Sequence, residues 1–446
     1  MSLVSSSFRT QSVSIARIGG PLIVNFLAVA GMGLADTVMS GRLGAEALAA
    51  VSVGHNTWML VFSGCLGVLM ALSPIIARHY GAGEINKIGR YTRHGMYLGF
   101  LLGLLILLIG RPLVEPFLTL IGIDTGFRDL TVDYVRALLF GAPGILMFIA
   151  LRFTSEGIGY TRPIMFTSVF SLTCNVFLNY VLMFGHFGAP ALGVEGCAYA
   201  SAITMWIVFF ALSLYMTVSP KLKELKIFTR IGQFRPVLFR EIVWLGIPIS
   251  IMITAEIGLF SVVSILVGTR GVEITAAHQI AISYASSMFM VPLALSSATT
   301  VQVGHMLGAG RAADARTAGF AGIAMSALFM AISAIVLLVF RDQIIRFYTD
   351  DAGVIGIALS LLLVAAIFQV ADGVQISAAA ALRAYKDTAF PMAINIFAFW
   401  VVAFPLAYLA AITYRLPASQ IWVAFIVGLG LAAVLLTWRF NRLSRA

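Results

Sequence analysis

Charged side chains are scarce in this sequence. Only 11% of its 446 residues are Asp, Glu, Lys or Arg, whereas 60% are hydrophobic. A soluble globular domain has about 25% charged and about 45–50% apolar residues. The composition therefore excludes an ordinary soluble domain and indicates a membrane protein. No polar segment between the hydrophobic runs is long enough to fold as a separate soluble domain.

Cysteine is also rare. Cys65, Cys174 and Cys197 are an odd number, and their spacing fits neither a metal site nor a redox pair, so we expect buried thiols. Three catalytic motifs are missing as well: HExxH, GxxxxGK[ST] and Gly-x-Ser-x-Gly. Their absence argues against a zinc protease of that type, an ATP-driven pump within this chain and an ordinary serine hydrolase. We therefore do not expect an enzyme.

What the chain does have is hydrophobic runs that can cross about 30 Å of hydrocarbon as helices, and none shows the alternation of a barrel strand. An all-α membrane protein with twelve spans is predicted. The spans are expected at about residues 14–38, 52–77, 94–110, 132–151, 163–184, 194–217, 241–267, 278–304, 318–340, 353–381, 390–412 and 418–438. The first residues lack the pattern of a removable signal peptide, so the first span is expected to be an uncleaved anchor.

Positive charge follows the predicted loops. With the N-terminus inside, 21 of the 29 Lys and Arg residues lie on the inner side, as the positive-inside rule expects. Both termini are therefore predicted to be cytoplasmic. The net charge of +10 then reflects membrane topology, and no nucleic-acid partner is expected. The longest basic stretch begins at Lys221 and is predicted to lie along the anionic inner leaflet.

An internal repeat divides the chain in half. A shift of 227 residues aligns Gly19 with Gly246, Pro21 with Pro248, Gly31 with Gly258, Gly41 with Gly268, Gly44 with Gly271, Glu46 with Glu273, and GAG at 81–83 with GAG at 308–310. The repeat predicts a six-helix lobe at 1–218, a cytoplasmic connector at 219–240 and a second six-helix lobe at 241–446. An even number of spans per repeat relates the lobes by an axis along the membrane normal, around a central cavity.

Glycine spacing predicts close helix packing within the first lobe. The segment GMYLGFLLG at 95–103 places three glycines on one helix face, four residues apart. Such a face lets two helix backbones approach closely.

Three acidic residues fall inside predicted spans: Asp36, Glu256 and Asp372. A carboxylate near the bilayer centre costs a few kcal/mol and needs a partner, a proton or water. We expect no Lys or Arg deep in any span to neutralise these acids. The repeat aligns them with Val263, Val29 and Ile145, so the acids are not duplicated although the scaffold is. They are predicted to bind a coupling proton or Na⁺.

Helical spacing suggests polar neighbours for these acids. Asn25 lies eleven residues before Asp36 on nearly the same helix face, and Gln369 and Gln375 flank Asp372 at i−3 and i+3. Asn175 and Asn179 lie one turn apart. They suit either this polar site or hydrogen-bonded packing between helices.

Four stretches together resemble the multidrug and toxic compound extrusion (MATE) family, NorM branch: ADTVMSGRLGAEALAAVSVG, AEIGLF, AAHQIAIS and LRAYKDTAFP. The resemblance spans the whole chain. It implies a V-shaped pair of six-helix lobes that exports organic cations, such as fluoroquinolones and cationic dyes, in exchange for inward Na⁺ or H⁺.

The resemblance also assigns roles to particular residues. It matches Asp36 to the acid of the family's first helix, Glu256 and Asp372 to the acidic pair of the second lobe, and Asn175 and Asn179 to the polar pair of the first. Ser201 stands where the family often has Thr, and His278 matches a NorM-like position at the outer start of its span, as a proton relay or a structural histidine.

Two departures from the family pattern leave the coupling ion open. Asn179 stands where some branches have Asp, and Ala384 replaces a usual Gly. The resemblance otherwise implies a monomer in a bacterial inner membrane, whose partners are cationic drugs and membrane lipids and whose only cofactor is the coupling ion. Two alternatives remain: a lipid-linked oligosaccharide flippase of the same superfamily, which would need a basic cavity, and a membrane-embedded enzyme or channel.

Overall fold

The computed structural model describes residues 2–228 and 234–445, and within these ranges the chain contains helices and turns but no strand. Twelve helices among the described residues are long and apolar enough to cross a membrane. The predicted all-α class and the number of spans are confirmed. The chain is a multi-pass membrane protein.

Two compact units divide the chain: Met1–Gly19 with Ile251–Ala446, and Gly20–Ser250. We call them the C unit and the N unit. The predicted division at 219–240 differs from these boundaries, because two long helices, α1 (Ser2–Gly41) and α11 (Pro236–Gly268), each contribute residues to both units. The changes fall at Gly19–Gly20 and Ser250–Ile251, each close to a proline of the repeat.

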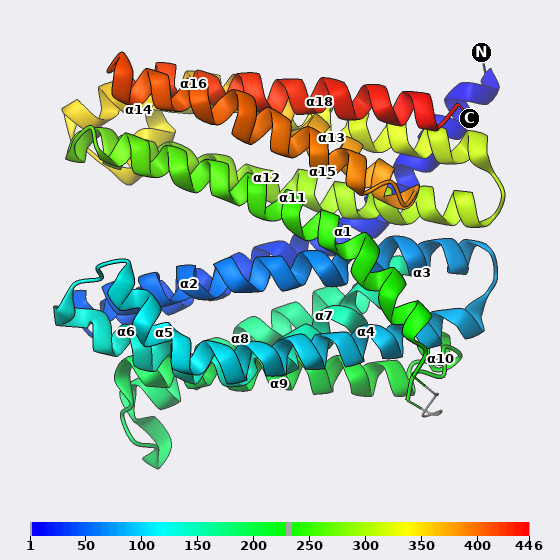
Figure 1. Cartoon of the computed structure of the whole chain (residues 1–446), viewed down its shortest axis with the longest axis horizontal. Helices are drawn as coiled ribbons and strands as arrows, with labels where there is room; N and C mark the ends of the chain where they lie inside the picture. The colour runs from blue at the N-terminus through cyan, green and yellow to red at the C-terminus, as the bar shows by residue number, and fades with distance from the viewer. Residues whose placement is uncertain (1, 229–233, 446) are drawn as a thin grey trace. The chain divides into compact units, whose positions relative to one another are not determined.

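The N unit contains the end of α1, the start of α11 and the elements between them (Figure 1). These are α2 (Ala45–Met70), α3 (Leu72–Gly81), α4 (Ile85–Leu105), η1 (Ile106–Gly110), α5 (Arg111–Leu120), α6 (Thr125–Leu138), η2 (Leu139–Gly141), α7 (Ala142–Gly157), α8 (Arg162–Phe184), η3 (His186–Gly188), α9 (Gly193–Val218) and α10 (Pro220–Lys223).

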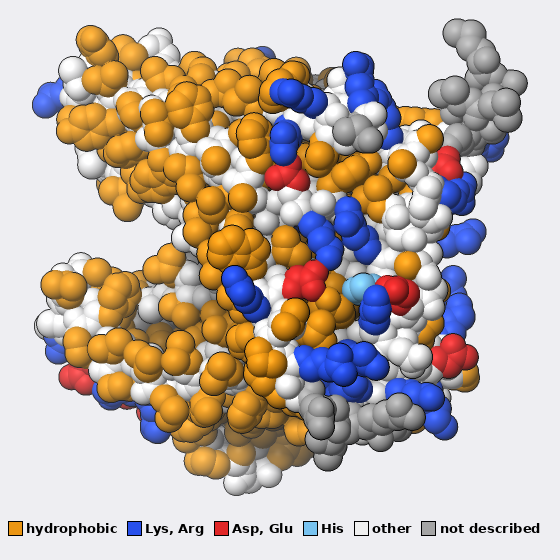
Figure 2. Space-filling model, turned by 45° about the vertical axis from the view of Figure 1, so that its right-hand side comes forward, with side chains coloured by type: hydrophobic (Ala, Val, Ile, Leu, Met, Phe, Trp, Pro, Cys, Tyr) orange, Lys and Arg blue, Asp and Glu red, His pale blue; other side chains and the backbone are white. Residues whose placement is uncertain are grey.

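The C unit contains the start of α1, the end of α11 and the later elements. These are α12 (Val272–Gly308), α13 (Ala312–Tyr348), α14 (Ala352–Ala384), α15 (Ala389–Ile396), η4 (Phe397–Ala403), α16 (Phe404–Tyr408), η5 (Leu409–Thr413), α17 (Ala418–Ile421) and α18 (Val423–Leu443). In the space-filling view of the whole chain, hydrophobic side chains cover much of the left-hand part, and Lys and Arg side chains gather toward the right-hand part (Figure 2).

Matching turns support the repeat. Gly83 and Gly310 both have φ of 71°, and Gly44 and Gly271 have φ of 125° and 116°. Only glycine adopts such values without strain, so the repeat keeps glycine at both copies of each turn. The turns place corresponding helix starts at corresponding points of the two units.

The predicted glycine face packs as expected. A Cβ at Gly99 or Gly103 would collide with the α7 backbone at Leu146 and Pro143, and one at Gly95 would collide with Leu72. The close approach of α4 and α7 is therefore possible only because these positions lack a side chain.

Two π-helical stretches precede prolines. η1 ends two residues before Pro112, and η4 ends two residues before Pro405. Proline has no N–H, so the carbonyls of Leu108 and Val401, four residues earlier, lose their ordinary α-helical donor. A widened turn gives these carbonyls another donor, which explains why the helix changes to π geometry here.

The helices extend beyond several predicted spans. The predicted span 94–110 lies within 85–120, 132–151 within 125–157 and 318–340 within 312–348. Polar residues continue a helix after its apolar stretch ends, because the backbone hydrogen bonds need no apolar side chain. Hydropathy therefore finds the segment in hydrocarbon and misses the helix ends.

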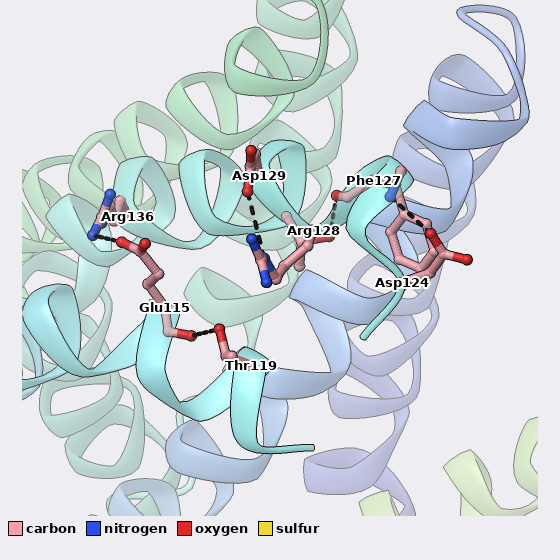
Figure 3. A network of polar contacts seen from close by, with 9 residues as sticks. Glu115, Thr119, Asp124, Phe127, Arg128, Asp129 and Arg136 are labelled. Atoms are coloured by element: carbon pink, nitrogen blue, oxygen red, sulfur yellow. Dashed lines mark hydrogen bonds and ion pairs between the residues drawn. The ribbon is translucent and has the colours of Figure 1, made fainter. Parts of the chain in front are cut away.

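Paired charged side chains lie near one such helix end, where α5 is followed by α6 (Figure 3). Arg136 contacts Glu115 at 2.9 Å, and Arg128 contacts Asp129 at 3.5 Å. Asp124 caps α6 by accepting a hydrogen bond from Gly126 N at 2.7 Å. Exposed pairs of this kind contribute at most about 1 kcal/mol each.

The predicted connector is shorter than expected and packs against its own unit. Residues 236–240 belong to α11, and residues 229–233 lie outside the described residues. Leu222, Leu225 and Ile227 are buried, and Arg93 on α4 donates to the Lys226 carbonyl at 2.8 Å. The first part of the connector is therefore anchored to α4.

Candidate functional site

Asp36 lies in a closed ring of polar side chains from α1, α8 and α9, all in the N unit. Asn179 Nδ2 donates to Asp36 Oδ1 at 2.6 Å, and the Ser201 hydroxyl donates to Asp36 Oδ2 at 3.4 Å. Asn175 Nδ2 donates to Ser201 Oγ at 3.0 Å, while Asn179 Nδ2 also approaches Asn175 Oδ1 at 3.3 Å. The asparagine pair thus holds the carboxylate.

This ring is buried and rich in oxygen. Asp36 is 8% exposed, and the buried Asn179 Oδ1 has no hydrogen-bond partner among the described residues. The buried Cys197 and Tyr134 interact electrostatically with Asp36. Neither residue could be predicted as a neighbour of Asp36, because a lone thiol and a lone phenol inside spans are usually packing residues. Carboxylate, amide and hydroxyl oxygens are ligands that hard cations prefer.

Asn25 lies outside the Asp36 ring. Its Oδ1 accepts a hydrogen bond from Ser168 at 2.6 Å, and its Nδ2 has no partner. Eleven residues along a helix advance about 16 Å, so a shared face does not bring the two side chains together. The predicted pairing of Asn25 with Asp36 is therefore wrong.

Glu256 and Asp372 belong to α11 and α14 and lie in the C unit. Gln375 Nε2 donates to Glu256 Oε2 at 3.4 Å, and the two carboxylates interact electrostatically. Asp372 is 6% exposed, and its Oδ1 has no hydrogen-bond partner in the part of the chain that the structure describes. Gln369 donates to the Met330 carbonyl at 3.4 Å, while the Oε1 atoms of Gln369 and Gln375 have no partner. The structure thus brings the predicted pair and Gln375 together.

A buried basic residue lies at the end of α14, just beyond the predicted span 353–381. Arg383 is the second-last residue of this helix, is 2% exposed and attracts Glu256 electrostatically. The predicted span ended at residue 381, but α14 continues to Ala384. Even so, neither Glu256, Asp372 nor Asp36 forms an ion pair within 4.0 Å among the described residues.

Arg152 and Glu156 were also assigned to the inner end of a span and are buried within α7. Glu156 is 1% exposed, accepts a hydrogen bond from Ser73 Oγ at 3.2 Å and attracts Arg152 electrostatically. The Arg152 guanidinium lies 5.1 Å from the centre of the Phe26 ring. The repeat places Glu156 and Arg383 at equivalent positions with opposite charge.

His278 occupies a fully hydrogen-bonded position. Trp422 Nε1 donates to His278 Nδ1 at 3.0 Å, and His278 Nε2 lies 2.8 Å from Ser264 Oγ. Since Nδ1 accepts, Nε2 has the hydrogen and donates it to Ser264, which donates in turn to the Phe260 carbonyl at 2.8 Å. This chain of donors favours the structural interpretation of His278.

The two acidic sites lie in different units. No group of three or more His, Cys, Asp or Glu side chains suited to a metal exists among the described residues. Any cation held here would need amide, hydroxyl or backbone oxygens in addition to carboxylates. Both sites offer such oxygens, and both can exchange a proton.

A family model named MatE matches residues 21–181 and 248–409. The two matches start 227 residues apart, which is the offset of the internal repeat. The chain belongs to the MatE family. The predicted family is thereby confirmed, and the protein is a membrane transporter.

Solved MATE structures have the same fold. The eukaryotic MATE transporter AtDTX14 is 22% identical, with 98% of each chain covered and a TM-score of 0.88. A mutant of the Vibrio cholerae MATE transporter VcmN is 18% identical, with 99% of this chain and 98% of that one covered and a TM-score of 0.89.

A third solved structure shares the fold. It is a transporter of the MOP superfamily from Pyrococcus furiosus, described as having a binding pocket of reverse polarity that suggests a different function. It is 21% identical, with 98% of this chain and 96% of that one covered and a TM-score of 0.88. Fold alone therefore does not identify the substrate of a MATE protein.

Proposed function

We propose that this MATE-family protein is a multidrug efflux antiporter that exports lipophilic organic cations in exchange for inward H⁺ or Na⁺. One observation supports this most strongly. Asp36, Glu256 and Asp372 lie in membrane-spanning helices, where a charge is costly. Asp36 and Asp372 are buried and Glu256 is half-buried, and none of the three has an ion pair within 4.0 Å among the described residues. A mobile positive ion would offset that cost.

The proposed exchange requires competition between the ion and the drug. A proton or Na⁺ at the carboxylates removes the negative charge that a cationic drug would otherwise meet. The ion-bound and drug-bound proteins then favour different conformations, so the two ligands exclude each other and alternate.

The flippase alternative is less well supported. A site for a lipid pyrophosphate needs several uncompensated basic groups. The buried Arg152 and Arg383 are each attracted by a carboxylate, Glu156 and Glu256. Their charge is therefore partly balanced within their own units, while three acids remain without an ion pair.

We also propose the cellular setting. The bias of Lys and Arg toward one side supports cytoplasmic termini, and the resemblance to NorM proteins supports a bacterial inner membrane and a monomeric transporter. Fluoroquinolones and cationic dyes are the proposed substrates.

Reconstituted transport tests the proposal. Proteoliposomes loaded with a fluorescent cationic dye are given a pH gradient or a Na⁺ gradient separately, and dye movement is followed. We expect movement under at least one gradient. Dye movement at the same rate with and without either gradient, or no dye movement at all, would overturn antiport as the function.

A further inference from the structure

An indole lies against the backbone that bears Glu256. Trp400, in the π-helical element η4, donates from Nε1 to the Ala255 carbonyl at 3.1 Å. A Cβ added at Gly258 would lie 2.8 Å from Trp400 Cζ2, so the ring rests on the bare helix at this glycine. Ala255 and Gly258 flank Glu256 on α11. Trp400 therefore fixes the turn of α11 from which the carboxylate projects.

Trp400 is not duplicated by the repeat. The equivalent of Trp400 in the N unit is Thr173, whose hydroxyl bonds to Val169 of its own helix at 3.1 Å. The glycine is duplicated, because Gly31 corresponds to Gly258, but the acid is not, because Val29 corresponds to Glu256. The helix also differs, since α8 is a regular α-helix where the C unit has η4. At these equivalent positions, the indole and the π turn are thus present in the C unit, beside Glu256, and absent from the N unit.

The position of this turn of α11 matters because the hydrogen bond between Glu256 and Gln375 is long. At 3.4 Å it is near the longest distance at which a hydrogen bond still forms. A small displacement of α11 away from α14 would break it and change how Glu256 faces Asp372 and Arg383, the charged groups that interact with it.

We infer that Trp400 is a positioning residue for Glu256: its indole, seated on Gly258 and bonded to the Ala255 carbonyl, holds the carboxylate at Gln375 and Asp372. The expected effect of Trp400 on transport rests on the proposed function, but the positioning of Glu256 does not. The positioning itself is a property of the C unit and can be measured without transport.

The test variant is Trp400→Phe, which keeps an aromatic ring and removes the N–H. The matched control is Trp206→Phe. Trp206 likewise donates from Nε1 to a backbone carbonyl, that of Phe140 at 3.0 Å, and likewise covers a glycine, Gly144. The control therefore loses the same kind of bond at a place away from Glu256.

Infrared difference spectra report on Glu256 directly. The carboxyl band that disappears in Glu256→Gln is titrated with pH in the wild-type, Trp400→Phe and Trp206→Phe backgrounds, and melting temperatures are recorded in parallel. We expect Trp400→Phe to move the titration midpoint by about half a pH unit or more, the scale of one modest hydrogen bond. Trp206→Phe should leave it unchanged.

The outcomes separate the two claims. An unchanged midpoint in Trp400→Phe overturns the positioning role, and so does an equal shift in Trp206→Phe. If the midpoint moves only in Trp400→Phe while dye transport ignores both ion gradients, the positioning role stands and the antiport proposal fails.

Discussion

The two units accommodate acidic side chains within their membrane-spanning helices in different ways. In the N unit a single carboxylate, Asp36, accepts hydrogen bonds from an amide and a hydroxyl. In the C unit two carboxylates share a site, and among the described residues their side-chain hydrogen bond is the long contact from Gln375 to Glu256. The N unit thus surrounds one acid with neutral donors, whereas the C unit places a second negative charge near the first. The repeat preserves the helices, but it aligns Asp36 with Val263, Glu256 with Val29 and Asp372 with Ile145, so the two acidic sites lie at non-equivalent positions.

Neutralising Asp36 or Asp372 should have the largest effect on transport. We expect Asp36→Asn and Asp372→Asn each to reduce gradient-driven dye efflux by at least about ten-fold, within the range of coupling free energies between two ligands. Efflux from proteoliposomes measures this, with melting temperatures to show that the fold persists. Asp129→Asn, at a highly exposed acid on α6, is the control and should be neutral. Wild-type rates in both test variants would refute the site assignment.

Making the N unit resemble the C unit should have an intermediate effect. Asn179→Asp places a second carboxylate against Asp36 and removes the 2.6 Å donor. Two adjacent carboxylates favour an added cation, so we expect the Na⁺ concentration for half-maximal efflux to fall by about five-fold, a coupling of roughly 1 kcal/mol. Asn179→Ala, which removes the donor without adding charge, is the comparison. An equal response of both variants would show that the donor matters and the added charge does not.

The smallest effect concerns a turn in which the two units have reversed charges. Glu84 contacts Lys87 at 2.7 Å in the N unit, and at the equivalent positions Arg311 contacts Asp314 at 2.7 Å in the C unit. Hydrogen bonds from Lys87 and His79 lower the pKa of Glu84 below its ordinary value of 4.5. A lowered folded-state pKa stabilises the protein above the unfolded pKa, and this contribution is lost as the pH falls through the folded value.

Melting temperatures of wild type and Glu84→Gln test this at several pH values. The variant should melt slightly lower at pH 7, and the difference should disappear as the pH falls well below 4.5. Asp314→Asn is the matched variant in the C unit. A difference between Glu84→Gln and wild type that grows toward low pH would contradict the assignment.

The membrane-spanning helices and the acids within them could be predicted because both are visible in the pattern of apolar residues along the sequence. A run of apolar residues has few alternatives in a bilayer, and an acid within it is conspicuous. Hydropathy could not predict the burial of Arg152, Glu156 and Arg383, because each of these residues lies where a helix continues beyond its apolar segment. The π turns that position Trp400 depend on which carbonyls lose a donor and on how neighbouring helices accommodate the extra residue, and hydropathy does not record this.

The ring around Asp36 has a mechanical consequence. An amide nitrogen cannot ligate a cation, so in the observed arrangement Asn179 presents the wrong atom to one: Nδ2 faces Asp36, and Oδ1 has no partner. Turning the amide plane by half a rotation exchanges these atoms and directs an oxygen toward the same place. The local change at Asn179 on cation binding would then be a single side-chain torsion.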